Sequence, residues 1–412
     1  ISMSNTTKQL ILLINSFDGG GAERQFSILA DYLPFTAIYC IESTNVYLDE
    51  SKHAVHYLST HNNKTRSLIK YLSTPYYAYK LYKQLKGKKN IQVLSVLERA
   101  HLVSYLLSFF MKIDHIMSFQ LSHKSHYKGI SGSVLKFIFK KVTQRSLFSI
   151  PNSYAGAIEM AELYQIPSAK ITAIPNGYNF EEIQTRSLLN HESPFSTLLQ
   201  QPYILCVARF LGQKAQDKLI MAFSNIKKTH PGLKLVFAGT GEKMQACIDL
   251  SMSLSLKTFV YNQEPYTDDH DVYFLGFQKN PLVLMKHASI FAFPTYYEGL
   301  PNALIEAMIC GAVPVSSDCP TGPREIIAPD TQLTTQAQNY EVSPNGILIA
   351  PFDANNPDKA NGVQAWTEAL NYLLDHPSLV ANIQSHLPSR VAEYNMNVII
   401  EKWNQVIAQL AK

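Results

Sequence analysis

Short apolar runs alternate with amphipathic segments along the whole chain, a pattern typical of parallel sheets connected by crossover helices. Residues 9–15, QLILLIN, form a continuous apolar run that predicts a buried first strand, and residues 22–33 have the period of a following helix. Further strands of the first half are predicted at residues 36–41, 91–96, 113–118, 147–150 and 170–174. A second series is predicted at residues 203–208, 234–238, 272–275, 290–293 and 313–316.

Two such series in tandem predict an α/β fold of two Rossmann-like domains, whose parallel sheets face each other across a cleft. The length of 412 residues and the hydrophobic content of 46% agree with two large cores. The polar stretch 186–201 is the expected linker, so we expect domains at residues 1–188 and 200–388 and a final segment at residues 389–412. Because ligands of such sheets bind at the carboxyl ends of the strands, the cleft is the expected active site.

Cysteine usage and the start of the chain indicate a cellular compartment. The five cysteines are odd in number and form no CxxC pair, which argues against a disulfide framework or a zinc site and favours a reducing environment. Cys310 and Cys319 are expected to be small buried residues. No apolar run approaches the ~20 residues of a membrane span, and the polar start has no signal-peptide pattern. We therefore expect a cytoplasmic protein.

Charge is divided unevenly along the chain. Residues 1–185 contain 20 Lys and Arg against 12 Asp and Glu, whereas the remainder contains 16 against 20. The positive charge gathers in two acid-free stretches that also carry aromatic and aliphatic side chains, residues 64–89 and residues 124–145. This mixture suits an anionic membrane surface, where each basic side chain contributes about 1 kcal/mol. Solvated helix faces are the alternative. No nucleic-acid recognition motif accompanies the charge, so nucleic acid is not an expected partner.

The strongest local signal is the segment 296–318, YYEGLPNALIEAMICGAVPVSSD. Pro301 suits the first position of a helix that would run through residue 309, with its free N–H groups turned toward the cleft. Such a helix N-terminus can bind a diphosphate without a metal. Glu298 lies just before the helix, and Glu306 lies about 7–8 Å along its axis, a step similar to that from a β-phosphate to its ribose. We predict that Glu298 binds sugar hydroxyls and Glu306 binds ribose hydroxyls; a plain helix with two surface glutamates is the alternative.

Two cations follow the first strand of the second series, in the sequence CVARFLGQK. Arg209 and Lys214 would lie at the carboxyl end of that strand and face the cleft. Two fixed positive charges at this place can neutralise a leaving diphosphate, which magnesium does in other transferases. Ordinary surface charges are the alternative.

Two further loops carry weaker signals. Gly19, Gly20 and Gly21 lie between the first strand and the first helix, where they allow a ligand to approach the backbone closely. This loop lacks the G-x-G-x-x-G pattern, so a nicotinamide dehydrogenase is a weaker alternative. The loop 267–271, TDDHD, has carboxylates that could hold a metal, but we interpret it as a solvated loop. We therefore expect neither a metal ion nor another cofactor.

Several of these segments together resemble the retaining glycosyltransferase family 4, whose members have the GT-B fold. The resembling stretches are spread over most of the chain: GGGAER (19–24), VARFLGQK (207–214), VFAGTGE (236–242), FLGF (274–277), EGLPNALIEAMICGAVPV (298–315) and DCPTGPREII (318–327). The last stretch is similar to enzymes of surface-polysaccharide assembly. The final segment resembles the family's C-terminal helix, which crosses back onto the first domain.

The resemblance implies a metal-independent transferase that moves a hexosyl or N-acetylhexosaminyl group from a nucleotide diphosphate sugar, a UDP-sugar being favoured over a GDP-sugar. The catalytic residues would be Glu298, Arg209 and Lys214. The donor-binding residues would also include Gly20, Gly21, Phe277, Gly299, Leu300, Pro301, Asn302, Ala303 and Glu306. A histidine of the first domain is expected on the sugar or acceptor side, with His123 and His126 as candidates beside His101.

The leading hypothesis is transfer to a glycan or lipid-linked acceptor in bacterial surface-polysaccharide or lipopolysaccharide biosynthesis. The enzyme would be cytoplasmic and peripheral on the inner face of the cytoplasmic membrane. A soluble acceptor, such as a protein or a sugar phosphate, is a second hypothesis. A non-catalytic subunit that binds nucleotide sugar is a third, and the joint presence of Glu298, Glu306, Arg209 and Lys214 argues against it.

Overall fold

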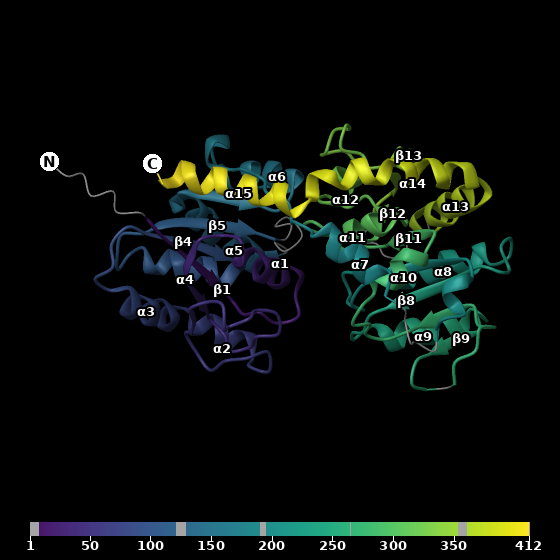
Figure 1. Ribbon diagram of the computed structural model, residues 1–412, viewed down its shortest axis with the longest axis horizontal. Helices are drawn as coiled ribbons and strands as arrows, with labels where there is room; N and C mark the ends of the chain where they lie inside the picture. The colour runs from purple at the N-terminus through teal and green to yellow at the C-terminus, as the bar shows by residue number, and fades with distance from the viewer. Residues whose placement is uncertain (1–7, 121–128, 190–194, 264, 353–360, 412) are drawn as a thin grey trace. The chain divides into compact units, whose positions relative to one another are not determined.

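The computed structural model describes residues 8–120, 129–189, 195–263, 265–352 and 361–411 (Figure 1). The chain divides into two compact units. Unit 1 contains residues 1–177 and 396–412, and unit 2 contains residues 178–395. Each unit is built around its own sheet of parallel or mostly parallel strands joined by helices, so the predicted α/β class with two Rossmann-like domains is confirmed.

Unit 1 contains a six-stranded sheet in the order β3-β2-β1-β4-β5-β6, and all its neighbouring strands are parallel. Its strands are β1 (Gln9–Ile14), β2 (Phe35–Cys40), β3 (Val55–Tyr57), β4 (Ile91–Val96), β5 (Asp114–Phe119) and β6 (Phe148–Pro151). Its helices are α1 (Gly21–Ala30), α2 (Ser67–Leu72), α3 (Thr74–Leu85), α4 (Glu98–Leu107), α5 (Gly129–Arg145), α6 (Tyr154–Tyr164) and α15 (Met396–Ala411).

The continuous apolar run of β1 is explained by burial on both faces of the unit 1 sheet. Leu10, Leu12 and Ile14 pack with residues of α1 and α15, whereas Ile11 and Leu13 pack with residues of α3 and α4. Because alternate residues of a strand point to opposite faces, a strand covered on both sides must be apolar at every position.

Unit 2 contains an eight-stranded sheet in the order β13-β14-β12-β11-β7-β8-β10-β9, in which only the β13–β14 pair is antiparallel. Its strands are β7 (Tyr203–Val207), β8 (Lys234–Ala238), β9 (Thr258–Val260), β10 (Val272–Phe274), β11 (Ile290–Phe293), β12 (Val313–Ser317), β13 (Tyr340–Ser343) and β14 (Gly346–Ile349). Its helices are α7 (Phe180–Ser187), α8 (Gln216–Ile226), α9 (Met244–Ser253), α10 (Leu282–His287), α11 (Asn302–Cys310), α12 (Pro323–Ile327), α13 (Asn361–Asp375) and α14 (Pro377–Val391).

One of the predicted strands is wrong, and the others lie within one residue of their expected bounds. Residues 170–174 form no strand: a 3₁₀ turn spans Ser168–Lys170, and a single bridge joins Ser149 to Ile171. Pro167 and Pro175 flank this segment, and a proline has no N–H group to donate to a ladder of hydrogen bonds.

The boundaries between the two units differ from those predicted at residues 188, 200 and 389. The first boundary falls between Gly177 and Tyr178. Phe195 and Leu198, both within the expected linker 186–201, pack in the core of unit 2, so these described residues belong to that unit. The chain returns to unit 1 at residue 396, where Trp403 of α15 lies edge-on to Phe26, with 6.0 Å between ring centroids.

Candidate active site

The strand order of unit 2 determines where a ligand can bind. Strand β7 lies between β11 and β8, and the chain leaves β7 toward β8 but later returns to its other side with β11. In open sheets of this kind, ligands bind at the carboxyl ends of the strands where the order reverses. The loops that follow β7 and β11, residues 208–215 and 294–301, lie at this point.

Lys214 and Glu298, which are far apart in the sequence, meet at this edge of the sheet. The Lys214 ammonium forms an ion pair with Glu298 Oε1 and lies 4.4 Å from the centroid of the Phe293 ring. The same carboxylate oxygen accepts hydrogen bonds from Thr295 Oγ1 at 2.8 Å and Gln213 Nε2 at 3.2 Å. Among the described residues, the bonds to this carboxylate all fall on Oε1, so Oε2 can accept from a ligand.

The backbone around Glu298 is held by the loop after β12. Thr321 Oγ1 donates a hydrogen bond to the Glu298 carbonyl oxygen. Gly322 has φ +90°, and a Cβ atom on it would lie 2.4 Å from the Gly299 carbonyl oxygen. Only glycine fits this close approach without displacing the Glu298 loop.

Asp318 anchors this supporting loop and is fully buried. Its carboxylate accepts from Arg324 Nη2 at 2.5 Å and from the Ala337 N–H at 2.6 Å. Arg324 Nη2 also donates to Glu341 Oε2 at 2.8 Å. Asp318 and Arg324 of DCPTGPREII therefore bond to each other and hold the loop, a role that the sequence reasoning did not assign.

Helix α11 begins one residue later than predicted, at Asn302, and Pro301 is its N-cap with φ −74° and ψ 105°. The Asn302 side chain does not cap the helix: its Oδ1 accepts a hydrogen bond from the Tyr178 hydroxyl at 2.6 Å. The first N–H groups of a helix have no carbonyl acceptor within it, so this end suits an anion. Leu300 is buried, and Ala303 lies in the first turn. Glu306 is buried in the second turn, about 6 Å along the axis from Asn302.

Arg209 is exposed in the loop after β7, and two glycines of the neighbouring loop position this segment. Gly239 and Gly241 have φ +144° and +156°, and Cβ atoms there would lie 2.0 Å from the Ala208 and 2.3 Å from the Phe210 carbonyl oxygen. The Phe210 N–H donates to the Thr240 carbonyl at 2.9 Å. The sequence reasoning missed this packing, for which the signal is the pair of glycines directly after β8.

Phe277 lies in the loop after β10 and is 76% exposed. Gly276 before it has φ +66°, a left-handed conformation that glycine adopts without strain. A large exposed ring at the carboxyl edge of the sheet offers a flat apolar surface to a ligand.

The residues predicted in unit 1 are only partly described. Gly20 is the N-cap of α1 and Gly21 its first residue, at the carboxyl end of β1, where the order of that sheet reverses. His101 is buried, and its Nδ1 lies 2.8 Å from Ser95 Oγ, so it belongs to the core of the unit. His123 and His126 lie outside the described residues.

Two groups beside Glu298 have shifted pKa values. Burial raises the pKa of the Tyr297 hydroxyl, and the carboxylate of Glu298 raises it further. The pKa of the Cys319 thiol is raised well above its usual value for the same two reasons. Both groups are therefore neutral near pH 7. All five cysteines are buried and unpaired, as expected for Cys310 and Cys319.

Two carboxylates of the acidic loop 267–271 are engaged with lysines. Asp271 Oδ1 pairs with Lys227 at 2.7 Å, and Asp269 Oδ2 lies 3.6 Å from Lys257. The described part of the chain contains no group of three or more His, Cys, Asp and Glu side chains that could hold a metal ion. Nor do the described residues include a helix of the length and apolar character needed to cross a bilayer.

Comparison with known proteins relates unit 2 and the fold to one class of enzyme. Residues 191–383 match the family model described as glycosyl transferases group 1. A glycosyltransferase of Methanocaldococcus jannaschii is 27% identical over 246 residues, which cover 58% of this chain and 57% of that protein. The chain thus spans little more than half the length of this relative.

One further relative and one solved structure extend over more of the chain. The N-acetylgalactosamine-N,N'-diacetylbacillosaminyl-diphospho-undecaprenol 4-alpha-N-acetylgalactosaminyltransferase of Campylobacter jejuni is 25% identical over 329 residues, covering 78% of this chain and 84% of that enzyme. The crystal structure of HepE from Anabaena in complex with UDP superposes with a TM-score of 0.73 at 15% identity, covering 97% of this chain and 100% of that one.

Proposed function

We propose that the chain, which has the GT-B fold and matches the glycosyl transferases group 1 model at residues 191–383, is a glycosyltransferase that moves a sugar from a UDP-sugar to a glycan or lipid-linked acceptor. The transfer retains the anomeric configuration and requires no metal. The observation that carries this proposal is the succession of the buried Glu298, the N-terminus of α11 and the buried Glu306 in the segment that follows β11.

The donor would bind along this edge with its diphosphate at the first turn of α11. There the N–H groups of Asn302 and Ala303 and the cations of Arg209 and Lys214 supply positive potential. Glu298 Oε2 would accept from sugar hydroxyls, because its hydrogen bonds within the described protein are made by Oε1. Glu306, further along the axis, would accept from the ribose hydroxyls.

The reaction makes one bond and breaks one. The bond between the anomeric carbon and the diphosphate oxygen breaks, and its electron pair stays on the diphosphate. The acceptor hydroxyl oxygen bonds to the anomeric carbon from the same face, and its proton passes to the leaving phosphate oxygen. Arg209, Lys214 and the α11 terminus stabilise the charge that grows on the diphosphate during this step.

Two similarities support the choice of donor and acceptor. The solved structure of HepE contains UDP, and the name of the Campylobacter jejuni relative describes a substrate linked to diphospho-undecaprenol. Phe277, exposed after β10, would offer its ring to the uracil base. A donor with a purine base, such as a GDP-sugar, is the alternative. A comparison of UDP and GDP binding distinguishes the two.

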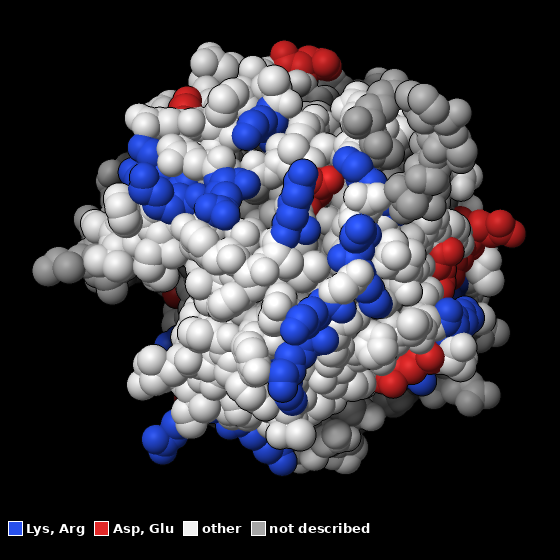
Figure 2. Space-filling view, turned by 90° about the vertical axis from the view of Figure 1, so that its left-hand side faces the viewer, with Lys and Arg blue, Asp and Glu red and all other residues white. Residues whose placement is uncertain are grey.

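A lipid-linked acceptor requires contact with a membrane surface, and unit 1 has side chains that suit such contact. Helix α3 lies in the acid-free stretch 64–89 and exposes Tyr76 and Tyr79, over which the ammonium groups of Lys80 and Lys83 lie 5.2 Å from the ring centroids. A face on which Lys and Arg side chains gather with few Asp and Glu appears in Figure 2. We infer a cytoplasmic enzyme peripheral on the inner face of the membrane.

Slow hydrolysis of nucleotide sugars in the absence of acceptor tests the proposal. A panel of UDP- and GDP-sugars is incubated with the full chain, and the anomer first released is identified by NMR. We expect hydrolysis of one or a few UDP-sugars, with release of the anomer that the donor carried. Release of the opposite anomer contradicts retention, and preference for GDP-sugars contradicts the base assignment. If the full chain neither hydrolyses a nucleotide sugar nor binds a nucleotide, the donor site itself is contradicted.

A further inference from the structure

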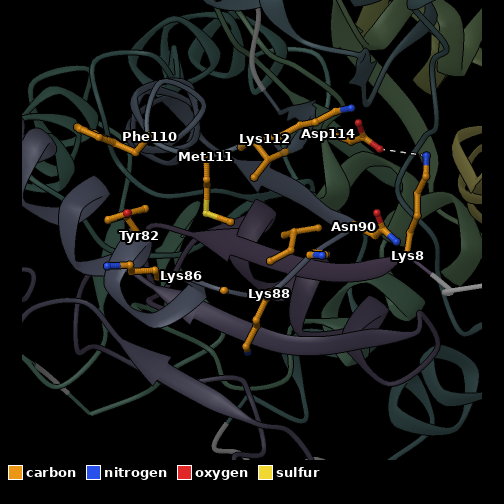
Figure 3. A pocket seen from close by; sticks show the side chains of 13 residues that line it. Lys8, Tyr82, Lys86, Lys88, Asn90, Phe110, Met111, Lys112 and Asp114 are labelled. Atoms are coloured by element: carbon orange, nitrogen blue, oxygen red, sulfur yellow. Dashed lines mark ion pairs between the residues drawn. The ribbon is translucent and has the colours of Figure 1, made fainter.

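A cavity of about 580 Å³ opens at the amino edge of the unit 1 sheet, away from the loops at its carboxyl edge (Figure 3). It lies where α3 and α4 end and where β4 and β5 begin. The residues that line it are Lys8, Tyr82, Lys86, Gly87, Lys88, Lys89, Asn90, Ile91, Phe110, Met111, Lys112, Ile113 and Asp114. Since strands of six residues span about 20 Å, the cavity is separate from the predicted sugar and acceptor positions.

The lining of this cavity is strongly basic. It contains five lysines and one carboxylate, and the carboxylate of Asp114 pairs with Lys8 at 3.0 Å. The other four lysines, at positions 86, 88, 89 and 112, make no ion pair with any carboxylate in the described part of the chain. The cavity therefore has an excess of about four positive charges.

Helix termini account for only part of this charge. Helices α3 and α4 end at the cavity, and each helix C-terminus carries about half a negative charge, which cations stabilise. These two ends and the C-terminus of α15, whose Leu410 carbonyl accepts a hydrogen bond from Lys8, amount to about one and a half negative charges, against about four positive ones. The surplus indicates an anionic ligand.

The remaining wall of the cavity is apolar, and its aromatic rings extend onto the surface. Tyr82 and Phe110 lie 5.8 Å apart between ring centroids, and Phe110 is 55% exposed. Next to it, Phe109 is 57% exposed and lies beneath the Arg145 guanidinium, 4.3 Å from its ring centroid. Exposed aromatic rings beside basic side chains are typical of the interface between membrane and water.

We propose that this cavity binds the phosphate of an anionic phospholipid headgroup, while Phe109 and Phe110 enter the headgroup layer. The volume is larger than a free phosphate ion needs and falls in the range of sites for small organic ligands, so the bound group carries more than the phosphate alone. The inference rests on the proposed membrane contact of unit 1 and narrows it to one lipid chemistry and one site.

The test measures binding of soluble short-chain lipids to the full chain by calorimetry. The probes are dihexanoyl phosphatidylglycerol, dihexanoyl phosphatidylcholine and inorganic phosphate, each below the concentration at which micelles form. The cavity variant is the double substitution Lys86→Ser and Lys112→Ser. The matched control is Lys80→Ser with Lys83→Ser, which removes two lysines of α3 that lie outside the cavity lining.

We expect phosphatidylglycerol to bind to the wild type and to the control, and the cavity variant to bind it about thirtyfold more weakly, from roughly fivefold for each lysine. Phosphatidylcholine should bind much more weakly, because its headgroup has no net charge. Equal affinity for inorganic phosphate shows a free-phosphate site and overturns the headgroup assignment. Equal loss in both double variants, or no binding to any probe, overturns the site.

A second measurement separates this inference from the proposed enzyme activity. Hydrolysis of the donor should be unchanged in the cavity variant, because neither lysine belongs to the donor site in unit 2. If the wild type binds phosphatidylglycerol but hydrolyses no donor, the proposed function fails and the lipid site stands. If it hydrolyses the donor but binds no lipid, the lipid site fails and the proposed function stands. The Phe110→Ser variant keeps all charges of the cavity but loses an exposed ring. It should adsorb more weakly to phosphatidylglycerol vesicles and should still bind dihexanoyl phosphatidylglycerol.

Discussion

Lys214 and Glu298 form an ion pair at the carboxyl edge of the unit 2 sheet, with 14% and 9% of their side chains exposed. Their predicted partners are different parts of the donor, the diphosphate for Lys214 and the sugar for Glu298. A donor bound as proposed would give the lysine a second anionic partner. Glu298 would thus hold the ammonium in place before the donor arrives and compete with the diphosphate for it afterwards.

This competition predicts opposite effects of Glu298→Gln on affinity and on rate. Removing the carboxylate leaves a largely buried ammonium without its counter-charge, and a diphosphate can replace that charge. We expect UDP to bind about three- to tenfold more tightly and transfer to fall by at least about a hundredfold, since the charge beside the anomeric carbon is lost. Calorimetry with UDP and initial rates of donor hydrolysis measure the two effects. Weaker UDP binding in this variant contradicts the competition.

Glu306→Ala should act mainly on nucleotide affinity. The ribose contact is present in the ground state and in the transition state alike, so its loss raises the dissociation constant and the apparent KM more than it lowers kcat. A charge-assisted contact contributes about 1.5–3 kcal/mol, which corresponds to roughly a ten- to hundredfold weaker binding of UDP. Asp249→Ala, an exposed acidic position on α9 of the same unit, is the control. Unchanged UDP affinity in Glu306→Ala argues against the alignment of donor and helix.

The close approach of Gly322 to the Glu298 loop predicts that Gly322→Ala harms both stability and activity. An added Cβ would lie 2.4 Å from the Gly299 carbonyl oxygen, at a residue with φ +90°. The strain should cost about 1–3 kcal/mol of unfolding free energy, and the displaced loop should slow transfer. Gly232→Ala is the matched control, because a Cβ there meets no atom within 4 Å. If the two variants unfold at the same temperature and transfer at the same rate, the Glu298 loop gives way to the added Cβ and the predicted strain is absent.

Transfer should continue in excess EDTA, because Arg209, Lys214 and the N-terminus of α11 supply the positive potential at the diphosphate. Arg209→Ala should reduce the rate by about ten- to a hundredfold, in EDTA and in magnesium alike. Initial rates with both additives measure this. A rate that vanishes in EDTA and returns with magnesium or manganese contradicts the proposal.

His115 predicts how the stability of unit 1 depends on pH. Burial lowers its pKa to about 3, far below the ordinary value of 6.5, so the folded state keeps this ring neutral where the unfolded state protonates it. Its contribution is complete above pH 6.5 and is lost as the pH falls from 6.5 toward 3, amounting to about 2 kcal/mol between pH 7 and pH 5. Denaturant unfolding of His115→Gln at both pH values should show a correspondingly smaller pH dependence.

Ten of the fourteen strands that the structure describes were predicted, including the edge strand β6, and four were missed: β3, β9, β13 and β14. β1, β4 and β11 are buried on both faces, so their apolar runs are continuous and easy to recognise. β3 and β9 have three residues each and lie at the edges of their sheets, where a short run gives no clear period. Neither strand was predicted.

The site shows a similar division between local and distant information. Glu298, Arg209 and Lys214 were selected from their positions after strands, and the structure places them in the loops at the carboxyl edge of one sheet. The pairing of Lys214 with Glu298 joins residues on different loops, and the support from Thr321 depends on a third. Such contacts follow from the packing of the whole unit and leave no pattern in the sequence around any one residue.

Helix α15 determines when the core of unit 1 can be completed during synthesis. The apolar face that Trp403 covers, with Phe26 and Ile174 in it, is complete only when residues 178–395 have been translated. At ~5–20 residues per second this interval is on the order of 10–40 s. A nascent unit 1 therefore waits with an open hydrophobic face, a binding surface for chaperones, while unit 2 is still being made. Unit 1 thus starts to emerge from the ribosome before unit 2 and is completed after it.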